Sequence, residues 1–276
     1  MSVQRLEFPD AVMEIIHPTA TLSARTAGIS WYGYEEWSNK SVSRQEPAGT
    51  RLVLILESGA PLTVATPQNT SRHVGGFLAG LDDAPTRTTH DGHQAGVQIN
   101  LTLADAARWF GMPPAALMRQ VVSALDILPE PLREVTRRLP DDQLSWSEKL
   151  QLIAAAMPQG PSVPHRQEQT LHWVLNAIRK HNGGLPVESL ARDVGWSTRR
   201  LQRAFSAYVG LSPKRYSRIV RFEALCTMLR QQTHLHWADA AEMLGYFDQP
   251  HLSNEVQSLA GTTPAMLSNS IRSMTA

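Results

Sequence analysis

One phrase occurs twice in this chain, and it restricts the fold of the C-terminal half more than any other feature. Each copy reads as an apolar helix, a glycine, a second apolar helix, and then a glycine followed by a Ser-Pro or Thr-Pro pair. The copies are LPVESLARDVGWSTRRLQRAFSAYVGLSPKRY at 185–216 and HWADAAEMLGYFDQPHLSNEVQSLAGTTPAML at 236–267. Gly195 and Gly245 end the two first helices, because glycine adopts the left-handed C-terminal cap without a steric penalty. The repetition predicts two helix-turn-helix units.

In each unit the second helix has one apolar face and one polar face. In the first unit, Leu201, Phe205 and Tyr208 recur at helical spacing and are predicted to face the core. Ser197 is a suitable N-cap for this helix, whose polar face carries basic side chains. Between the units, KRYSRIVRFEALCTMLRQQ at 214–232 is amphipathic along its length. We therefore expect one long helix to join the two units.

The 276-residue chain has a net charge of +1, but its charges are unevenly distributed. Residues 1–160 carry −4, whereas residues 161–276 carry +5. Residues 192–221 alone hold eight basic side chains and one acid, Asp193. Such a segment in an otherwise neutral chain is typical of a polyanion-binding surface, although a solvated helix face has the same composition. The basic residues are Arg192, Arg199, Arg200, Arg203, Lys214, Arg215, Arg218 and Arg221.

The two units and the helix between them resemble the DNA-binding domain of the AraC/XylS family of bacterial transcription regulators, over roughly residues 166–270. In that family the second helices read successive major grooves of double-stranded DNA. Arginine pairs well with guanine, and glutamine with adenine. Carried over by position, the resemblance implies base contacts from Thr198, Arg199, Gln202 and Arg203 in the first unit and from Gln249, His251, Asn254 and Gln257 in the second. The predicted DNA-binding set also includes Arg200 and three residues placed to contact phosphates, Lys214, Arg215 and Arg218.

The second unit departs from the family pattern in its charge. Residues 234–261 contain no Lys or Arg and four acids, Asp239, Glu242, Asp248 and Glu255. A cation contributes to DNA affinity by releasing counterions from a phosphate, so a unit without cations grips DNA weakly. Two interpretations remain open. Either this unit reads bases through neutral side chains, or it faces a protein partner such as RNA polymerase.

The N-terminal half has a different periodicity. Short β-prone runs such as ISWYGYEEW and LVLIL alternate with turn clusters over residues 19–100. From Thr102 the period becomes helical. We expect PPAALMRQVVSALDIL at 113–128 to form one helix, and short helices to follow at 130–139 and 144–157.

These patterns predict an α+β fold in three segments. A mostly-β domain with C-terminal helices occupies residues 1–157, and a Pro- and Gly-rich linker occupies 158–165. An all-α domain of two helix-turn-helix units joined by a long helix occupies 166–276.

Several N-terminal segments, among them TAGISWYGYEEW and GTRLVLILES, resemble the domain that precedes such a DNA-binding domain in a large actinobacterial-type subgroup, over roughly residues 20–130. That domain is taken to sense a small-molecule effector or to form a homodimer, and the resemblance implies one of these roles. Aromatic walls are common in ligand sites, which makes Trp31, Tyr32, Tyr34 and Trp37 candidates. Alternation along a strand places the two tryptophans on one face and the two tyrosines on the other, so one face is expected to be ordinary core.

Other chemistry has little support in the sequence. HDGH at 90–93 spaces two histidines three apart, but the Asp-Gly between them is typical of a hairpin tip, and we predict no metal site. No nucleotide-binding loop or nucleophile-elbow motif occurs, so we expect neither a cofactor nor an enzyme. Cys226 is expected to pack as a small hydrophobic side chain. No apolar run is long enough to cross a membrane and no secretory signal is recognised, which favours the cytoplasm.

Overall fold

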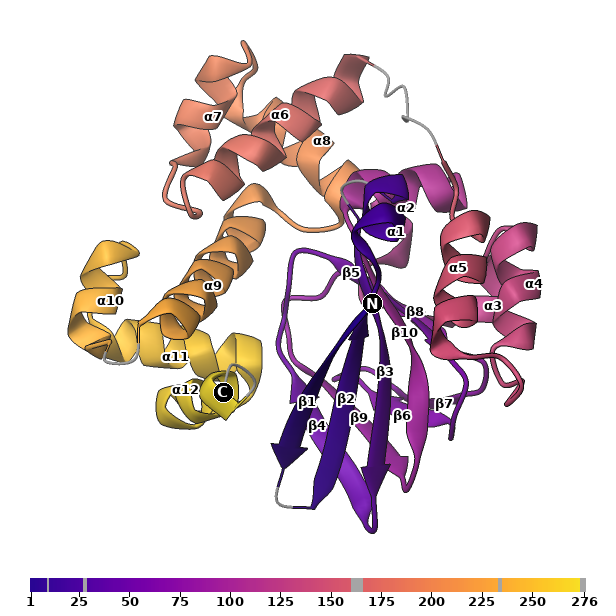
Figure 1. Ribbon diagram of the computed structural model, residues 1–276. Helices are drawn as coiled ribbons and strands as arrows, with labels where there is room; N and C mark the ends of the chain where they lie inside the picture. Colours follow the sequence, from indigo (N-terminus) through magenta and orange to yellow (C-terminus); the bar gives the residue numbers. More distant parts are fainter. Residues whose placement is uncertain (9, 27–28, 160–165, 233–234, 274–276) are drawn as a thin grey trace.

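The computed structural model describes residues 1–8, 10–26, 29–159, 166–232 and 235–273 (Figure 1). Its N-terminal part contains two antiparallel sheets, and its C-terminal part is helical throughout the described residues, which confirms the predicted α+β class. The larger sheet has the strand order β1-β2-β3-β10-β5-β8-β11, and the smaller sheet has the order β4-β9-β6-β7. The strands are β1 (Ser2–Phe8), β2 (Ala11–His17), β3 (Ser30–Ser38), β4 (Ser41–Glu46), β5 (Leu52–Glu57), β6 (Leu62–Ala65), β7 (Thr70–His73), β8 (Phe77–Ala79), β9 (Thr86–Asp91), β10 (Gln94–Leu101) and β11 (Val121–Ser123).

The apolar run LVLIL forms β5 and lies near the centre of the larger sheet, between β10 and β8. Side chains alternate between the two faces of a strand, and both faces of β5 are covered. Leu52, Leu54 and Leu56 are fully buried on the face that packs against helices. Ile55 belongs to a second, smaller apolar cluster with Leu62 and other residues between the two sheets. Burial on both sides explains why this strand reads as a continuous apolar run.

A layer of short helices covers one face of the larger sheet (Figure 1). The indole ring of Trp146 lies so close to Gly33 that a Cβ there would be 2.7 Å from it, and its Nε1 donates a hydrogen bond to Glu35 at 2.8 Å. This contact fixes the odd-numbered face of β3 against α5. The helices of this layer are α1 (Ala20–Arg25), α2 (Leu103–Phe110), η1 (Pro114–Leu117), α3 (Ala124–Ile127), α4 (Glu130–Arg138) and α5 (Trp146–Ala156).

The helical C-terminal part is organised around α9, which joins two groups of helices (Figure 1). Tyr216, Phe222 and Leu225 of α9 are buried in the core. Cys226 is buried beside them, and burial raises the pKa of its thiol to about 12, so the side chain packs as a small apolar group. None of the described helices is both long and apolar enough to cross a bilayer. The helices are α6 (Arg166–Lys180), α7 (Val187–Asp193), α8 (Thr198–Val209), α9 (Pro213–Gln231), α10 (Trp237–Met243), α11 (Gln249–Ala260) and α12 (Pro264–Ser273).

The segment 113–128 differs from its sequence-based expectation. It forms η1, β11 and α3 instead of one helix. Arg119 has a left-handed backbone (φ 56°), and its amide donates to the carbonyl of Leu81. The chain then continues as β11, which pairs with β8 at the edge of the larger sheet. Pairing with a long-range partner therefore overrides the helical period of the sequence.

Two further N-terminal expectations need correction, and a third lies mostly outside the described residues. Strands β1 and β2 precede the predicted β-rich segment, and they pair with each other and with β3. The HDGH turn at 90–93 is not a hairpin tip, because it connects β9 of one sheet to β10 of the other. Within the described residues, no group of three His, Cys, Asp or Glu side chains is arranged to hold a metal ion. Most of the predicted linker, 160–165, lies outside the described residues.

Glu57 provides a test of the sheet core. Its side chain is buried at the end of β5 and accepts a hydrogen bond from the amide of Leu62 at 3.3 Å. Burial raises the pKa of this carboxyl from 4.5 to about 8. The unfolded chain therefore releases the proton at lower pH than the folded chain, and the free energy of unfolding should fall between pH 4.5 and about 8.

Glu57→Gln should remove this component and raise the free energy of unfolding at pH 8 by on the order of 2 kcal/mol, with little effect at pH 4.5. Chemical unfolding at a series of pH values measures the effect. Glu7→Gln, which changes an exposed acid of the same sheet, should leave the pH profile of the unsubstituted chain unchanged. Parallel profiles for the Glu57→Gln variant and the unsubstituted chain would contradict the buried, protonated state of Glu57.

Candidate nucleic-acid interface

The first helix-turn-helix unit consists of α7, a tight turn and α8. The turn passes through Gly195 in the left-handed region (φ 67°). The hydroxyl of Ser197 then accepts a hydrogen bond from the amide of Arg200 at 3.2 Å, which caps the start of α8. Leu201 and Phe205 are fully buried on one side of α8. The apolar face fixes the rotation of the helix, and the basic face is consequently turned to solvent.

The predicted base-contacting face of α8 is accessible. Three of its four predicted contact residues are exposed, namely Arg199, Gln202 and Arg203, and the fourth, Thr198, is half-buried. The guanidinium of Arg200 lies over the ring of Trp196, 4.4 Å from its centroid. Within the described part of the chain, Arg199 and Arg203 form no ion pair. Their charges are available to an external polyanion.

The second unit repeats this geometry with different chemistry. Gly245 forms the turn between α10 and α11 with a φ of 68°. Leu252 and Val256 are fully buried on the inner face of α11. The predicted contact residues on its outer face are all exposed: Gln249, His251, Asn254 and Gln257. This face offers neutral hydrogen-bonding groups and no basic side chain except histidine.

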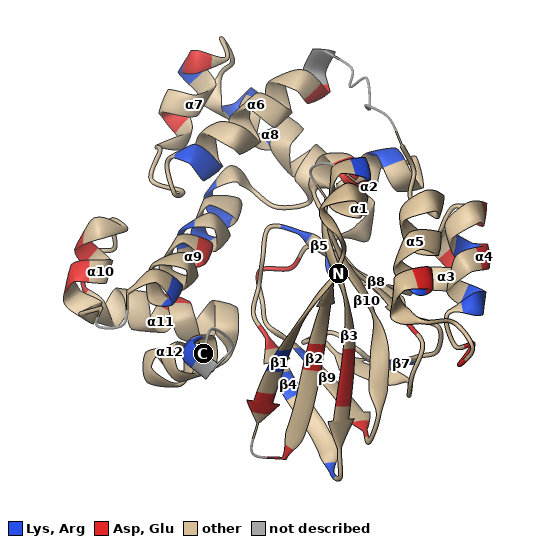
Figure 2. Cartoon of the chain, viewed as in Figure 1, with Lys and Arg blue, Asp and Glu red and all other residues tan. Residues whose placement is uncertain are grey.

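The two acids of α11 and its cap have structural roles. Asp248 is the N-cap, and its Oδ1 accepts a hydrogen bond from the amide of His251 at 2.7 Å. A carboxylate at a helix N-terminus is also favoured by the helix dipole. Glu255 is mostly buried and accepts from Nε of Arg218 through both oxygens at 2.9 Å. The other two acids of this unit, Asp239 and Glu242, are exposed on α10 (Figure 2).

Two predicted phosphate-contacting residues are ion-paired within the chain. Arg218 holds Glu255, and Arg215 holds Asp83 of the N-terminal region. Asp83 also accepts from Arg119 at 2.9 Å. Burial alone would raise the pKa of Asp83, but Arg119 and Arg215 outweigh it and hold the pKa below its usual value. Lys214, the third predicted phosphate contact, is exposed.

The N-terminal region contacts the far end of both second helices. Gly210 caps α8 and lies so close to η1 that a Cβ there would be 2.7 Å from Met118. Gly261 caps α11 and lies equally close to Gln45 of β4, the strand that leads into the loop containing Ala48. The amide of Ala48 donates to the carbonyl of Leu259 in α11 at 2.7 Å. The second helices of the two units, α8 and α11, which we call the recognition helices, therefore contact the N-terminal region through their C-terminal ends.

These contacts between regions were not anticipated from the sequence. One contact is the ion pair of Asp83 with Arg215. A second is made by Glu223 of α9, which accepts from the amide of Thr50 at 2.7 Å and from its hydroxyl at 2.8 Å. The partners are 173 positions apart for Glu223 and 132 positions apart for Arg215. No local pattern in a single sequence marks such a pair.

A cavity of about 380 Å³ lies within the N-terminal region, and α9 contributes to its wall. Tyr32 and Tyr34 line it, whereas Trp31 is buried in the core on the other face of β3. Trp37 is 42% exposed and stacks on His93 with ring centroids 5.7 Å apart. Burial, with a smaller contribution from the charge of Glu46, raises the pKa of the Tyr32 hydroxyl to about 12. Of the four predicted ligand-binding aromatics, the structure therefore brings only the two tyrosines to one site.

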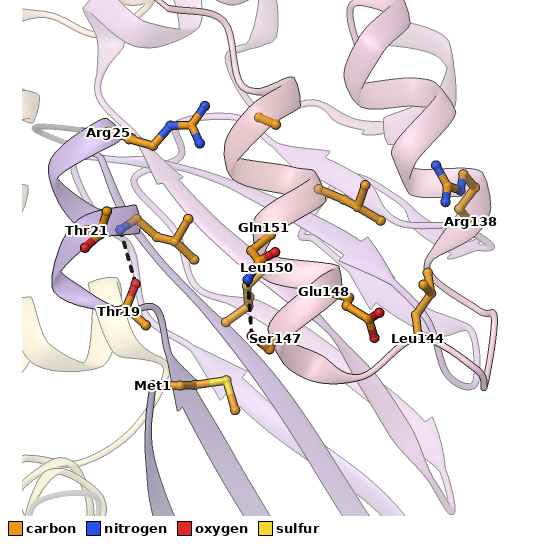
Figure 3. Close-up of a pocket in the computed structure, with 13 residues that line it drawn as sticks. Met1, Thr19, Thr21, Arg25, Arg138, Leu144, Ser147, Glu148, Leu150 and Gln151 are labelled. Carbon is orange, nitrogen blue, oxygen red and sulfur yellow. Dashed lines mark hydrogen bonds between the residues drawn. The ribbon is translucent and has the colours of Figure 1, made fainter.

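A larger, open groove of about 680 Å³ lies between α1 and α5 (Figure 3). Some of its polar groups are engaged locally. Thr19 caps α1 by accepting from the amide of Leu22, and Gln151 donates to Ser147 one turn earlier in α5. None of its described lining residues has a buried polar side-chain atom without a hydrogen-bond partner, and we assign the groove no role.

The geometry of the two units agrees with a family comparison. Residues 190–270 match the family model of a helix-turn-helix domain, in its AraC type. The chain carries an AraC-type helix-turn-helix domain. The matched residues contain most of α7 and all of α8 to α11, so both units belong to the AraC-type domain. Domains of this type bind DNA in transcription regulation.

Solved structures share features of the fold. ToxT from Vibrio cholerae aligns over 91% of this chain and 100% of its own, with a TM-score of 0.51 and 8% identity. The C-terminal domain of AraT, a response regulator from Geobacillus stearothermophilus, aligns over 38% of this chain and 88% of its own, with a TM-score of 0.35 and 23% identity. No curated protein sequence matches the chain. The likeness to ToxT shows that the arrangement of a β-rich region followed by a two-unit helical region is a known fold.

The exposed arginines of α8 give a direct test of base contact. Arg199→Ala or Arg203→Ala should weaken binding to a duplex selected from a random library by ~1–3 kcal/mol and relax the base preference at one position. Fluorescence anisotropy at fixed salt, on duplexes that differ at single base pairs, measures both effects. Arg230→Ala changes an exposed arginine at the C-terminal end of α9, outside the basic segment 192–221, and serves as the control. An equal loss on every duplex would reassign the residue to a phosphate contact.

The cap of α11 can be tested separately from its charge. Asp248→Ala should lower the free energy of unfolding by about 1 kcal/mol, because an amide at the helix start loses its partner, and Asp248→Asn should restore most of it. Thermal unfolding measures the difference, with Glu242→Ala as a control of equal charge change. If Asp248 acted only by repelling DNA, its removal would raise DNA affinity without a cost in stability.

Proposed function

We propose that the protein is a sequence-specific transcription regulator, with a DNA-binding domain at 166–276, a sensory or dimerising domain at 1–157 and a linker at 158–165. The proposal rests above all on the exposed, unpaired basic face of α8 within an AraC-type domain. A guanidinium without an internal partner loses no ion pair when it binds DNA, and its planar fork matches the acceptors of guanine. Arg199 and Arg203 are the residues that we assign to this role.

The two units contribute unequally in this proposal. The first unit supplies positive charge through α8 and through Lys214 at the start of α9, and therefore most of the salt-dependent affinity. The second unit supplies neutral readout, with Gln249 and Asn254 able to pair with adenine. Arg215 and Arg218 take part in DNA binding only if they exchange their internal carboxylates for phosphates.

The N-terminal region acts as the sensor in this proposal. Its cavity has aromatic walls that include Tyr32 and Tyr34, and the wall reaches α9 of the AraC-type domain. A small molecule bound there shifts the population of domain arrangements, because it binds one arrangement more tightly than another. Such a regulator works in the cytoplasm on double-stranded DNA. We propose no catalytic activity and no cofactor, and a homodimer is the alternative role of this region.

A second function has specific support on the surface of the second unit. Phe247 is 92% exposed in the turn between α10 and α11, and Met243 is 66% exposed beside it. The acids Asp239 and Glu242 are exposed on the same helix as Met243. Exposed apolar side chains bordered by charge are typical of a protein-docking surface. This surface favours a basic protein partner, such as a face of RNA polymerase, with only the first unit gripping DNA.

Affinity for DNA and the footprint distinguish these functions. The protein should bind a duplex from its own upstream region more tightly than a scrambled duplex of the same composition, at a fixed near-physiological salt concentration. Equal affinities would contradict specific regulation. Hydroxyl-radical footprinting then separates the two modes. Protection of two major grooves about one turn apart supports reading by both units, and protection of one groove supports the protein-partner role of the second unit.

A further inference from the structure

The cavity of the N-terminal region has an unusual wall, because the AraC-type domain forms part of it. Glu223 projects from α9 and lines the cavity together with residues of the loop between β4 and β5. That same loop holds the AraC-type domain, since Thr50 binds Glu223 and Ala48 binds the carbonyl of Leu259. An occupant of the cavity therefore touches both sides of the contact between the two regions.

The wall carries an excess of negative charge. Its acids are Glu36, Glu46, Asp82 and Glu223, and its basic residues are Arg44 and Arg51. Arg44 is already engaged, because its two terminal nitrogens donate to the two oxygens of buried Glu36 at 2.5 Å. Asp82 is also engaged, because Nε of Arg119 lies 3.5 Å from its Oδ1. Among the described residues, Glu46, Glu223 and Arg51 form no ion pair, and Glu46 and Arg51 are both exposed. Two unpaired carboxylates against one unpaired guanidinium leave the wall with a net negative charge.

Two hydrogen-bonding groups of the wall, on His90 and Glu223, also favour a ligand that carries hydrogen-bond donors. His90 is 5% exposed and lines the cavity, and its Nε2 lies 3.1 Å from Glu36. A carboxylate only accepts, so Nε2 carries the proton, and in the neutral ring Nδ1 is an acceptor. Among the described residues Nδ1 has no hydrogen-bond partner. Within the described part of the chain, both oxygens of Glu223 accept from Thr50 and from no other donor, and a carboxylate oxygen has room for a second donor.

The remaining wall groups have a mixed preference. Among the described residues, Nε2 of Gln94 is a buried donor without a hydrogen-bond partner, whereas Oδ2 of Asp82 is a buried acceptor without one. The amides of Gln94, Gln98 and Asn100 both donate and accept, so they accommodate either kind of ligand. Tyr32, Tyr34 and Phe77 present aromatic rings, whose faces attract organic cations. The cavity thus combines carboxylates, an unpaired buried acceptor and aromatic rings in a volume of about 380 Å³.

We propose that this cavity binds an organic cation with an apolar body, an amine or amidine, and that Glu223 and Glu46 hold its positive group. The inference rests on the proposed sensory function of the N-terminal region. Because the ligand is held from both sides, it binds the docked arrangement of the two regions in preference to any separated one. The cation therefore strengthens the contact between α9 and the β4–β5 loop, and with it the fixed spacing of the two recognition helices.

Matched pairs of probes test the charge preference on the full chain. The pairs are 2-phenylethylamine with 3-phenylpropanoate, tryptamine with indole-3-propanoate, and octylamine with nonanoate. In each pair only the charged group differs. Titration calorimetry should show at least one amine binding tenfold or more tightly than its carboxylate partner, as expected for a net negative wall. Failure of every amine to bind, or equal binding of the carboxylates, overturns the proposal.

Substitutions locate the bound cation. Glu223→Gln keeps the shape of the side chain and should weaken binding of the amine tenfold or more, whereas Glu242→Gln, an equal charge change on α10 outside the cavity, should leave it unchanged. Glu46→Gln tests the part of the wall formed by β4 without altering α9. Unchanged amine affinity in both cavity variants overturns the assignment of the site.

Hydrogen exchange at the contact separates docking from simple binding, since any ligand of the folded chain raises the thermal unfolding midpoint. A saturating amine should slow exchange of the amides of Ala48 and Thr50, which donate across the contact, and this effect should be lost in the Glu223→Gln variant. DNA affinity is measured in parallel. Specific DNA binding without amine binding sinks this inference alone, whereas equal binding to specific and scrambled duplexes sinks the proposed regulatory function.

Discussion

The carboxylate of Asp83 binds two guanidiniums, Arg119 from its own region and Arg215 from the first turn of α9. Burying a carboxylate is costly, and the cost is offset only while both charge-assisted partners are in place. Loss of Arg215 from this site would leave Asp83 with a single partner. The pair therefore favours one position of α9 over others. The positions of the two helix-turn-helix units relative to the N-terminal region therefore depend in part on this contact, because α9 joins the units.

Helix α9 sets the relation between the two units. Its 19 residues form a helix about 28 Å long, comparable with the ~34 Å of one turn of B-DNA, so it can hold the units about one turn apart. Arg221 near its middle donates to the carbonyl of Gly183 at 3.2 Å and lies over the ring of Tyr246, 5.2 Å from its centroid. One side chain thus contacts segments that precede the first unit and follow α10. At the outer ends, Gly210 and Gly261 rest against the N-terminal region. The second helices of the two units, α8 and α11, are consequently held at their C-terminal ends, and α9 is held to segments near both units.

The sequence was most informative where the determinants are local. The glycines at 195 and 245, the cap Ser197 and the apolar stripe of α8 each act within one or two turns, and all appear in the structure as predicted. The alternation of Trp31 and Tyr32 on β3 is of the same kind. Asp248 had a readable signal, since Asp followed two residues later by Pro250 is typical of a helix start, but its role as a cap was overlooked.

The sequence was least informative where a residue's role depends on a distant partner. The helical period of 113–128 was outweighed by pairing of β11 with β8, and no composition rule anticipates that pairing. Glu255 is one of four acids in the unit that is predicted to grip DNA weakly, but Arg218 lies 37 positions away in the sequence and pairs with it. The cavity is likewise assembled from strands of both sheets and from α9. A count of charges along a sequence overestimates the charge that the folded surface presents to DNA, because ion pairs formed in the fold neutralise part of it.

The internal pairing changes how the charge deficit of the second unit should be understood. Arg218 and Glu255 cancel each other, so the second unit offers DNA a surface closer to neutral than its four acids imply, while the first unit keeps Arg199, Arg203 and Lys214 unpaired within the described residues. Electrostatic affinity acts at long range and depends on salt, whereas neutral readout acts only at contact. In the function proposed above, the first unit therefore governs the initial encounter with DNA, and the second unit, held by α9, tests the neighbouring groove only after the first has docked. Two units with the same fold would thereby take successive roles, and the difference between them lies in which charges the rest of the chain has already neutralised.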